Sequence, residues 1–226
     1  MNDTRQALLM IGSPKAKSST SESLGTYLCD GLRARGLQTE TMRINAALRS
    51  DDGDRSLLTS IDAADVLILA FPLYIDSLPA GTTKALEIIA EHRKTQAEPR
   101  KQQIFAIVNS GFPEADQSET ALGICRLFAG DSGIEWLGGL ALGGGGAIDG
   151  RPLKEAGGMV RNVKKALDLA AADISEGRPI SQEATALTAR PAMPAWLYRL
   201  GGNFGWKRQA KQRGALDRIN DRPLKE

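Results

Sequence analysis

The stretch ALLMIGSPKAKSST, residues 7–20, carries the signal from which the fold class can be read. Five consecutive apolar residues lead into a glycine, a proline and a segment crowded with hydroxyl side chains and two lysines. A short apolar run without alternation is typical of a strand buried on both faces, as in a parallel sheet covered by helices. Helical periodicity follows, so we expect a strand, a turn and a helix in that order.

The expected helix covers about residues 20–35 and has start and stop signals at both ends. Ser19 and Glu22 have the spacing of a capping box, in which each side chain satisfies a backbone N–H of the first turn. Gly36 follows the last turn, where glycine commonly ends a helix. The segment therefore predicts a helix whose N-terminus opens directly on the turn after the first strand.

The same alternation of strand and helix recurs along the next 140 residues. Continuous apolar runs at 66–71, 104–108 and 136–142 predict buried strands, and the weakly alternating segment 38–44 predicts an edge strand. Helical patterns fall at about residues 79–93, 117–130 and 154–176, with a weaker one at 51–61. We therefore predict an α/β three-layer sandwich, with a five-stranded parallel sheet in the flavodoxin-like order 2-1-3-4-5 and helices on both faces.

The turn after the first strand has the composition of a phosphate-binding loop. Unpaired backbone N–H groups and a partial positive charge at a helix N-terminus attract anions, and hydroxyls and lysines add donors and charge. A soluble loop in which Ser19 only caps the helix is the alternative. The loop matches neither GxxxxGK[ST] nor GxGxxG, so a Walker A site is excluded and a dinucleotide fingerprint is disfavoured. The candidate phosphate ligands are Ser13, Lys15, Ser18, Ser19 and Thr20.

The loops after the next two strands could border a flat ring. The segment FPLYIDSLP, residues 71–79, combines an aromatic side chain, apolar residues and two prolines, and such a wall suits a planar heterocycle. The small and amide-bearing residues of segment 109–111 allow close backbone approach and hydrogen bonding. The glycine run 143–146 is as consistent with a flexible loop as with a ligand contact. The candidate ring contacts are Pro72, Leu73, Tyr74, Ile75, Asn109, Ser110 and Gly111.

These three loops together resemble those of the NAD(P)H-dependent FMN reductases and related flavodoxin-like oxidoreductases, over about residues 6–175. The family's first loop reads roughly Gly-Ser-Pro-Arg-x-x-Ser-Asn-Thr and holds the FMN phosphate; Lys15 stands in the place of its arginine and Ser19 in that of its asparagine. The loop beginning at Pro72 is similar to the family's Pro-Leu-Tyr-x-x-x-x-Pro flavin loop. The positions that match these two motifs are Gly12, Ser13, Pro14, Ser18, Thr20, Pro72, Leu73, Tyr74 and Pro79.

The resemblance implies an FMN-dependent oxidoreductase that passes hydride from NAD(P)H to a small-molecule acceptor such as a flavin or quinone. It also implies a homodimer. No residue is assigned as an acid–base catalyst, because the flavin supplies the reactive chemistry. With one histidine and two widely spaced cysteines the chain has little material for a metal site, and we expect none. The net charge of +2 argues against a nucleic-acid partner. Without an evident signal segment, a cytoplasmic location is expected.

The composition changes after residue 176, so we expect a flavodoxin-like domain at 1–176 and a C-terminal extension at 177–226. The extension begins as a polar linker and continues into a segment in which Trp196, Phe204 and Trp206 precede Lys207 and Arg208. We expect this segment to pack on the domain or on a dimer partner. Aromatic residues beside cations also suit a membrane interface. A non-enzymatic module, acting as an electron carrier or as a partner- or membrane-binding protein, therefore stays open as the alternative function.

Overall fold

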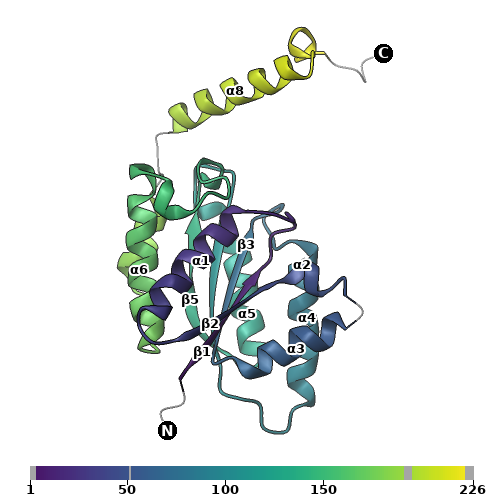
Figure 1. Cartoon of the computed structure of the whole chain (residues 1–226), viewed down its shortest axis with the longest axis vertical. Coiled ribbons are helices and arrows are strands. Elements are labelled where there is room, and N and C mark those ends of the chain that lie inside the picture. The colour runs from purple at the N-terminus through teal and green to yellow at the C-terminus, as the bar shows by residue number, and fades with distance from the viewer. Residues whose placement is uncertain (1–3, 51, 191–194, 222–226) are drawn as a thin grey trace. The chain divides into compact units, whose positions relative to one another are not determined.

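The computed structural model of the chain describes residues 4–50, 52–190 and 195–221. Five parallel strands form one sheet in the order β2-β1-β3-β4-β5, which confirms the predicted topology (Figure 1). The strands are β1 (Gln6–Ile11), β2 (Gln38–Arg43), β3 (Val66–Pro72), β4 (Gln103–Asn109) and β5 (Glu135–Leu142). Register brings Ile11 beside Ala70, and Pro72 beside Asn109. The carboxyl ends of β1, β3 and β4 therefore meet at one edge of the sheet.

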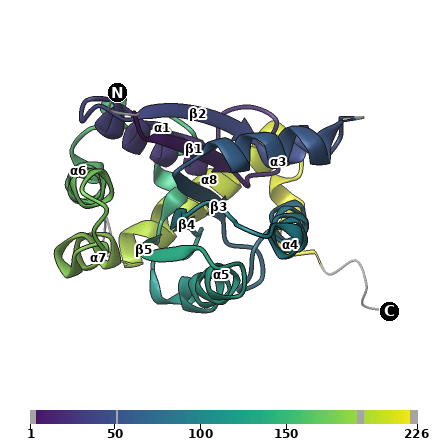
Figure 2. The ribbon, with the colours of Figure 1, turned by 90° about the horizontal axis from the view of Figure 1, so that it is seen from below.

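Helices cover both faces of the sheet, as Figure 2 shows. One face packs against α1 (Thr20–Arg33), α6 (Arg161–Ser175) and α7 (Gln182–Ala189). The other packs against α2 (Ile44–Ala47), α3 (Gly53–Ala63), α4 (Ala80–Thr95) and α5 (Glu119–Asp131). Alternate residues of each strand point into the two cores: Leu9 and Ile68 face the first, Leu8 and Leu67 the second. This is why the central strands appear in the sequence as unbroken apolar runs.

The start of α6 differs from the predicted helix at 154–176. Three short 3-10 turns, η2 (Gly145–Ala147), η3 (Leu153–Glu155) and η4 (Gly158–Val160), separate β5 from α6. Gly157 has a φ of 70°, a left-handed conformation that interrupts a helix. The apolar stripe from Val163 to Ile174 is buried as expected. The segment 145–160 is thereby left to wrap over the N-terminal turn of α1.

The segment after residue 176 contains more structure than a linker. Residues 182–189 form α7, which buries Ala184 and Leu187 in the core shared with α1 and α6. Ile180 donates its backbone N–H to the carbonyl of Leu137 at 2.7 Å and packs over Gly138. The compact unit accordingly runs from Met1 to Ala192, sixteen residues beyond the boundary expected from composition.

The second unit, Met193–Glu226, contains α8 (Ala195–Gln212) and the 3-10 turn η5 (Leu216–Arg218) among its described residues. Leu200, Phe204 and Trp206 of α8 have exposed fractions of 60%, 71% and 72%. The side chains of residues 195–199, Trp196 among them, lie outside the part of the chain that the structure describes. No helix within the described residues combines the length and apolar character required to cross a bilayer.

Both cysteines are free thiols inside the two cores. Cys29 lies on α1 and Cys125 on α5. Burial raises the pKa of the Cys29 thiol to about 11 and that of the Cys125 thiol to about 12. Because the thiolate is the reactive form, both side chains behave as small apolar groups at neutral pH.

Candidate functional site

Four loops meet at the carboxyl edge of the sheet, in the order expected of a doubly wound fold. Leu73 donates its backbone N–H to the carbonyl of Asn109 at 2.8 Å, which ties the loop after β3 to the loop after β4. Gly145 donates to the carbonyl of Ser110 at 2.8 Å, which adds the loop after β5. Thr20 donates its hydroxyl to the carbonyl of Gly145 at 2.9 Å, which connects the start of α1 to the loop after β5. The structure therefore brings all three predicted site segments together.

The first loop presents unpaired backbone donors at the start of α1. Lys15 donates its N–H to the Ser13 hydroxyl at 3.4 Å, and Glu22 donates to the Ser19 hydroxyl at 3.2 Å. Between them, the N–H groups of residues 16–21 have no acceptor among the described residues. Such a run of N–H groups at a helix N-terminus, where the helix dipole is positive, is a ready anion site. A phosphate monoester fits this donor set.

The candidate phosphate residues divide into exposed and internally engaged side chains. Lys15 and Ser18 are exposed, and the Lys15 ammonium lies 3.7 Å from the Asp149 carboxylate. Ser13, Ser19 and Thr20 are buried. Ser19 caps α1 as predicted, but the predicted reciprocal bond of the capping box is not formed, because Glu22 pairs with Arg43 instead. The Thr20 hydroxyl proton is directed to Gly145. Of the predicted set, Lys15 and Ser18 thus have the side chains most available to a ligand, while Ser19 and Thr20 shape the loop.

Acidic and basic side chains beside the loop cancel one another. Glu22, in the first turn of α1, would repel a bound phosphate if it stood alone. Arg43, at the end of β2, forms an ion pair with it. This pair leaves Lys15 and Lys17 as the exposed charges of the loop itself and preserves its positive character.

The loop after β3 is a tight turn that displays apolar side chains. Tyr74 and Ser77 exchange backbone hydrogen bonds at 2.9 and 3.1 Å. Ile75 and Asp76, between them, have left-handed φ values of 49° and 58°. A β-branched residue in this region is unusual and is associated with functional loops. The turn leaves Ile75 99% exposed and Tyr74 49% exposed, so both are positioned as surface that a ring could cover.

The predicted amide ligand Asn109 is turned inward. The Ser21 hydroxyl donates to its side-chain oxygen at 2.6 Å, and both residues are buried. Ser110 donates its hydroxyl to the carbonyl of Phe112 at 3.2 Å. The polar side chains of this loop therefore support the edge, while Phe112, which is 56% exposed, adds a second aromatic surface to it. Gly111 is exposed.

Three residues outside the predicted site hold the loops of this edge in place. Thr82 of α4 donates its hydroxyl to the carbonyl of Gly12 at 3.2 Å, and a Cβ on Gly12 would approach that hydroxyl to 2.3 Å. Gly150 has a φ of 73°, and its Cβ would lie 2.7 Å from the Ser18 carbonyl oxygen. Thr82 and Gly150 thus tie α4 and segment 145–160 to the first loop, and Ser21 ties α1 to Asn109 at the end of β4. No sequence motif marks them, because the contacts join distant positions.

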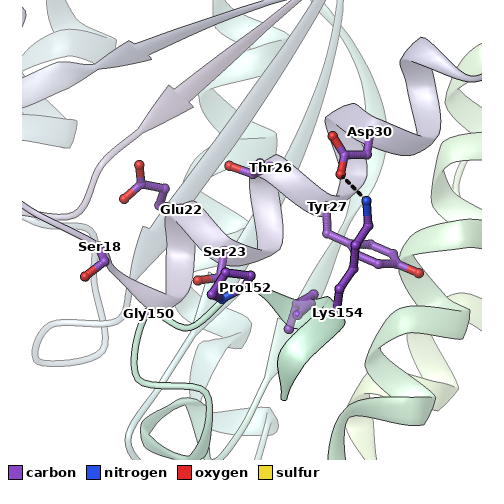
Figure 3. Close-up of a pocket in the computed structure, with 10 residues that line it drawn as sticks. Ser18, Glu22, Ser23, Thr26, Tyr27, Asp30, Gly150, Pro152 and Lys154 are labelled. Atoms are coloured by element: carbon purple, nitrogen blue, oxygen red, sulfur yellow. Dashed lines mark hydrogen bonds and ion pairs between the residues drawn. The ribbon is translucent and has the colours of Figure 1, made fainter. Parts of the chain in front are cut away.

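A pocket of about 290 Å³ begins beside this loop and continues along the outer side of α1. Figure 3 shows Ser18 and Gly150 at one end and the Asp30–Lys154 ion pair, 3.0 Å long, toward the other. The hydrogen bond from Lys154 is the main cause that lowers the pKa of Asp30, so that this carboxylate is ionised at neutral pH. Among the described residues, no group of three or more His, Cys, Asp or Glu side chains is arranged to hold a metal ion.

The fold and this edge define the chain as a flavodoxin-like α/β protein. Comparison with protein-family models gives no match, and comparison with the sequences of curated proteins gives none either. Solved structures do match. An FMN-dependent NADH-azoreductase from Bacillus anthracis, in complex with FMN, superposes with a TM-score of 0.55 at 12% identity, covering 76% of this chain and 100% of its own.

Two further solved structures have the same architecture. An NADH:FMN oxidoreductase in its apo form has a TM-score of 0.54 at 18% identity, covering 84% of this chain and 97% of its own. A flavodoxin from Streptococcus pneumoniae has a TM-score of 0.51 at 14% identity, covering 76% and 98%. Likenesses at these identities show the flavodoxin-like fold.

Proposed function

We propose that the chain is an FMN-dependent NAD(P)H oxidoreductase of the flavodoxin-like FMN reductase family, with a flavin, a quinone or a similar small molecule as electron acceptor. The observation that carries the proposal is the unpartnered N–H run of residues 16–21, beside Lys15, at the sheet edge where the loops after β3 and β4 also end. The azoreductase and the NADH:FMN oxidoreductase of the same fold support it by what their names state.

The residues of this chain would hold and orient the cofactor. The N–H groups of the first loop and the Lys15 ammonium would bind its phosphate. Tyr74 and Ile75 would cover one side of its ring system, and the backbone of segment 109–111 would border the polar edge. The flavin, when bound, supplies the hydride chemistry. Exposed apolar side chains at this edge would exclude water from the ring as they are covered.

The absorbance spectrum of the purified protein tests the proposal. We expect flavin bands in the visible blue on addition of FMN, with a perturbed spectrum that shows binding, and bleaching when NADH or NADPH is added without oxygen. Comparing the two donors at equal concentration assigns the preferred one. A protein that leaves the FMN spectrum unperturbed would refute the proposal, and a non-enzymatic module would become the better interpretation. Binding without bleaching would indicate an electron carrier.

We further propose that the protein is a cytoplasmic homodimer and that α8 contributes to the contact between copies. Support comes from the exposure of Leu200, Phe204 and Trp206, since large exposed apolar side chains mark interaction surfaces. We expect size-exclusion chromatography with light scattering to give twice the chain mass, and the Phe204→Ala, Trp206→Ala double variant to give the monomer mass. Leu127→Ala, an exposed leucine of α5, is the control.

A monomeric wild-type protein would contradict this proposal. If it also sedimented with anionic vesicles, and the double variant did not, the membrane alternative would replace the dimer.

A further inference from the structure

The loops that would border the flavin ring carry only negative charge. The segments that follow β3 and β4, residues 72–79 and 109–120, contain no lysine, arginine or histidine. Lys15 and Lys17 of the first loop follow β1, which lies on the other side of β3 from β4. The edge of the sheet therefore has positive charge at its phosphate end and negative charge at its ring end. Four exposed carboxylates, which we call the acidic rim, supply the negative charge: Asp76, Glu114, Asp116 and Glu119.

The protein does not neutralise the acidic rim. Within the described part of the chain, none of the four carboxylates forms an ion pair. Cations of the neighbouring elements are engaged or distant. Lys84 of α4 lies 3.7 Å from Glu87, Arg151 donates to the carbonyls of residues 147 and 148, and Arg126 lies two turns into α5. The rim therefore keeps its negative charge for a molecule from outside.

Exposed apolar side chains accompany these charges. Ile75, which is 99% exposed, directly precedes Asp76, and Phe112, which is 56% exposed, lies two residues before Glu114. The 2.8 Å backbone hydrogen bond between the loops after β3 and β4 keeps both pairs at the same edge. A flat aromatic molecule gains contact with the apolar side chains. The carboxylates attract a positive charge on such a molecule and repel a negative one.

We infer that the electron acceptor of this site is a small aromatic cation, taken in preference to an anion of the same size. The inference rests on the proposed function, because the acceptor has to reach the ring that the loops after β3 and β4 would border. For a cationic quinone the reaction balances as follows. NAD(P)H gives up a hydride, and the quinone takes up that hydride's two electrons and proton, with a second proton from water, and leaves as the hydroquinone. The positive substituent serves recognition only.

Two quinones that differ only in charge test the inference. 1,4-Naphthoquinone with a trimethylammonium group on a propyl linker supplies the cation, and the same ring with a sulfonate on that linker supplies the anion. Their Kd values are measured on the oxidised, FMN-loaded protein without NAD(P)H, by the change in flavin fluorescence. In low-salt buffer we expect the cation to bind about tenfold or more tightly than the anion. We expect this ratio to shrink in about 0.5 M salt, because mobile ions screen exposed charges. With NADH or NADPH present, kcat/KM should follow the same order.

The Asp76→Asn, Glu114→Gln double variant removes two charges of the rim and keeps the shapes of the side chains. Residue 76 has a φ of 58°, which asparagine tolerates well, so the turn should stay folded. We expect the preference for the cation to fall about threefold or more, while the neutral 2-propyl-1,4-naphthoquinone binds as it does to wild type. Glu98→Gln with Asp131→Asn is the matched control. Both residues are exposed and precede β4 and β5, at the opposite end of the strands, so the preference should not change.

The outcomes separate this inference from the proposed function. If FMN bound and bleached while the two charged quinones bound equally, the inference would be overturned and the proposed function would stand. A preference for the cation that the double variant kept would overturn the inference as well. If the protein bound no FMN, the proposed function would be refuted. Calorimetry on the bare protein would then support charge selection by the rim if the cation bound more tightly and the double variant lost the difference, and equal affinities would overturn it.

Discussion

Replacing Ser13 and Lys15 together by alanine is expected to weaken FMN binding by about 10- to 100-fold, since the one hydrogen bond that Lys15 would make to the charged phosphate contributes about 1.5–3 kcal/mol. Riboflavin, which lacks the phosphate, is expected to keep its affinity. Fluorescence titration of both flavins on the wild type and the double variant measures the two effects side by side.

The structure supplies the reason for choosing this pair. The Lys15 side chain is 61% exposed, and its nearest acidic partner, Asp149, lies 3.7 Å away and is itself exposed. An exposed pair of this kind contributes little and is easily exchanged for a doubly charged phosphate. Ser13 accepts the Lys15 backbone N–H through its hydroxyl, so its removal also loosens the turn that presents the lysine.

Lys101→Ala is the matched control for charge. Lys101 is exposed and lies two residues before the start of β4, at the opposite end of the strands. Removing it lowers the net charge as Lys15→Ala does but leaves the first loop intact, so FMN affinity should stay within twofold of wild type. If the double variant bound FMN as wild type does, the phosphate assignment would be rejected. An equal loss for riboflavin would show a general disturbance of the edge instead.

Phe105→Ala is expected to lower the free energy of unfolding by about 3–5 kcal/mol, the usual cost of removing a buried aromatic ring from a packed core. Phe105 is fully buried in the middle of β4, on the face covered by α1, α6 and α7. It lies beside Ile68 of β3 and Gly138 of β5. Gly138 has no side chain that could move into the space left by the ring, so the substitution leaves a cavity in the core.

Phe112→Ala is the control for this substitution. The same change of residue at a position that is 56% exposed removes little buried area, and we expect less than about 0.5 kcal/mol. Urea denaturation followed by circular dichroism gives both values, with an unchanged m-value showing that the same surface is exposed. Equal destabilisation by the two variants would contradict the assignment of Phe105 to the central core.

Most of the fold could be predicted because its signals are local. The five strands appear as apolar runs or, for β2, as an edge pattern, and the capping hydroxyl of Ser19 marks the start of α1. The start of α6 could not be placed, because a helical apolar stripe does not reveal that Gly157 interrupts the chain ahead of it. The polar composition of its segment also gave no sign of α7, because the burial of this helix depends on contacts with β5 and α6.

The candidate site, like the fold, could be predicted from the sequence only in part. Residue types in the first loop, hydroxyls and lysines before a helix, point to phosphate chemistry from the sequence alone. Which of them face a ligand was decided by contacts between distant segments. Ser21 turns Asn109 inward, and Gly145 engages Thr20, over separations of 88 and 125 residues. The pocket along α1 likewise exists only because segment 145–160 folds back on that helix.

The sequence by itself determined the order of elements, the parallel sheet and the anion-binding character of the first loop, because hydrophobic periodicity, capping and backbone geometry act between near neighbours in the chain. Tertiary structure alone decided which polar side chains form hydrogen bonds within the sheet edge and which remain available to a ligand. A buried polar group must find a hydrogen-bond partner wherever the fold brings one, and that partner is seldom close in sequence.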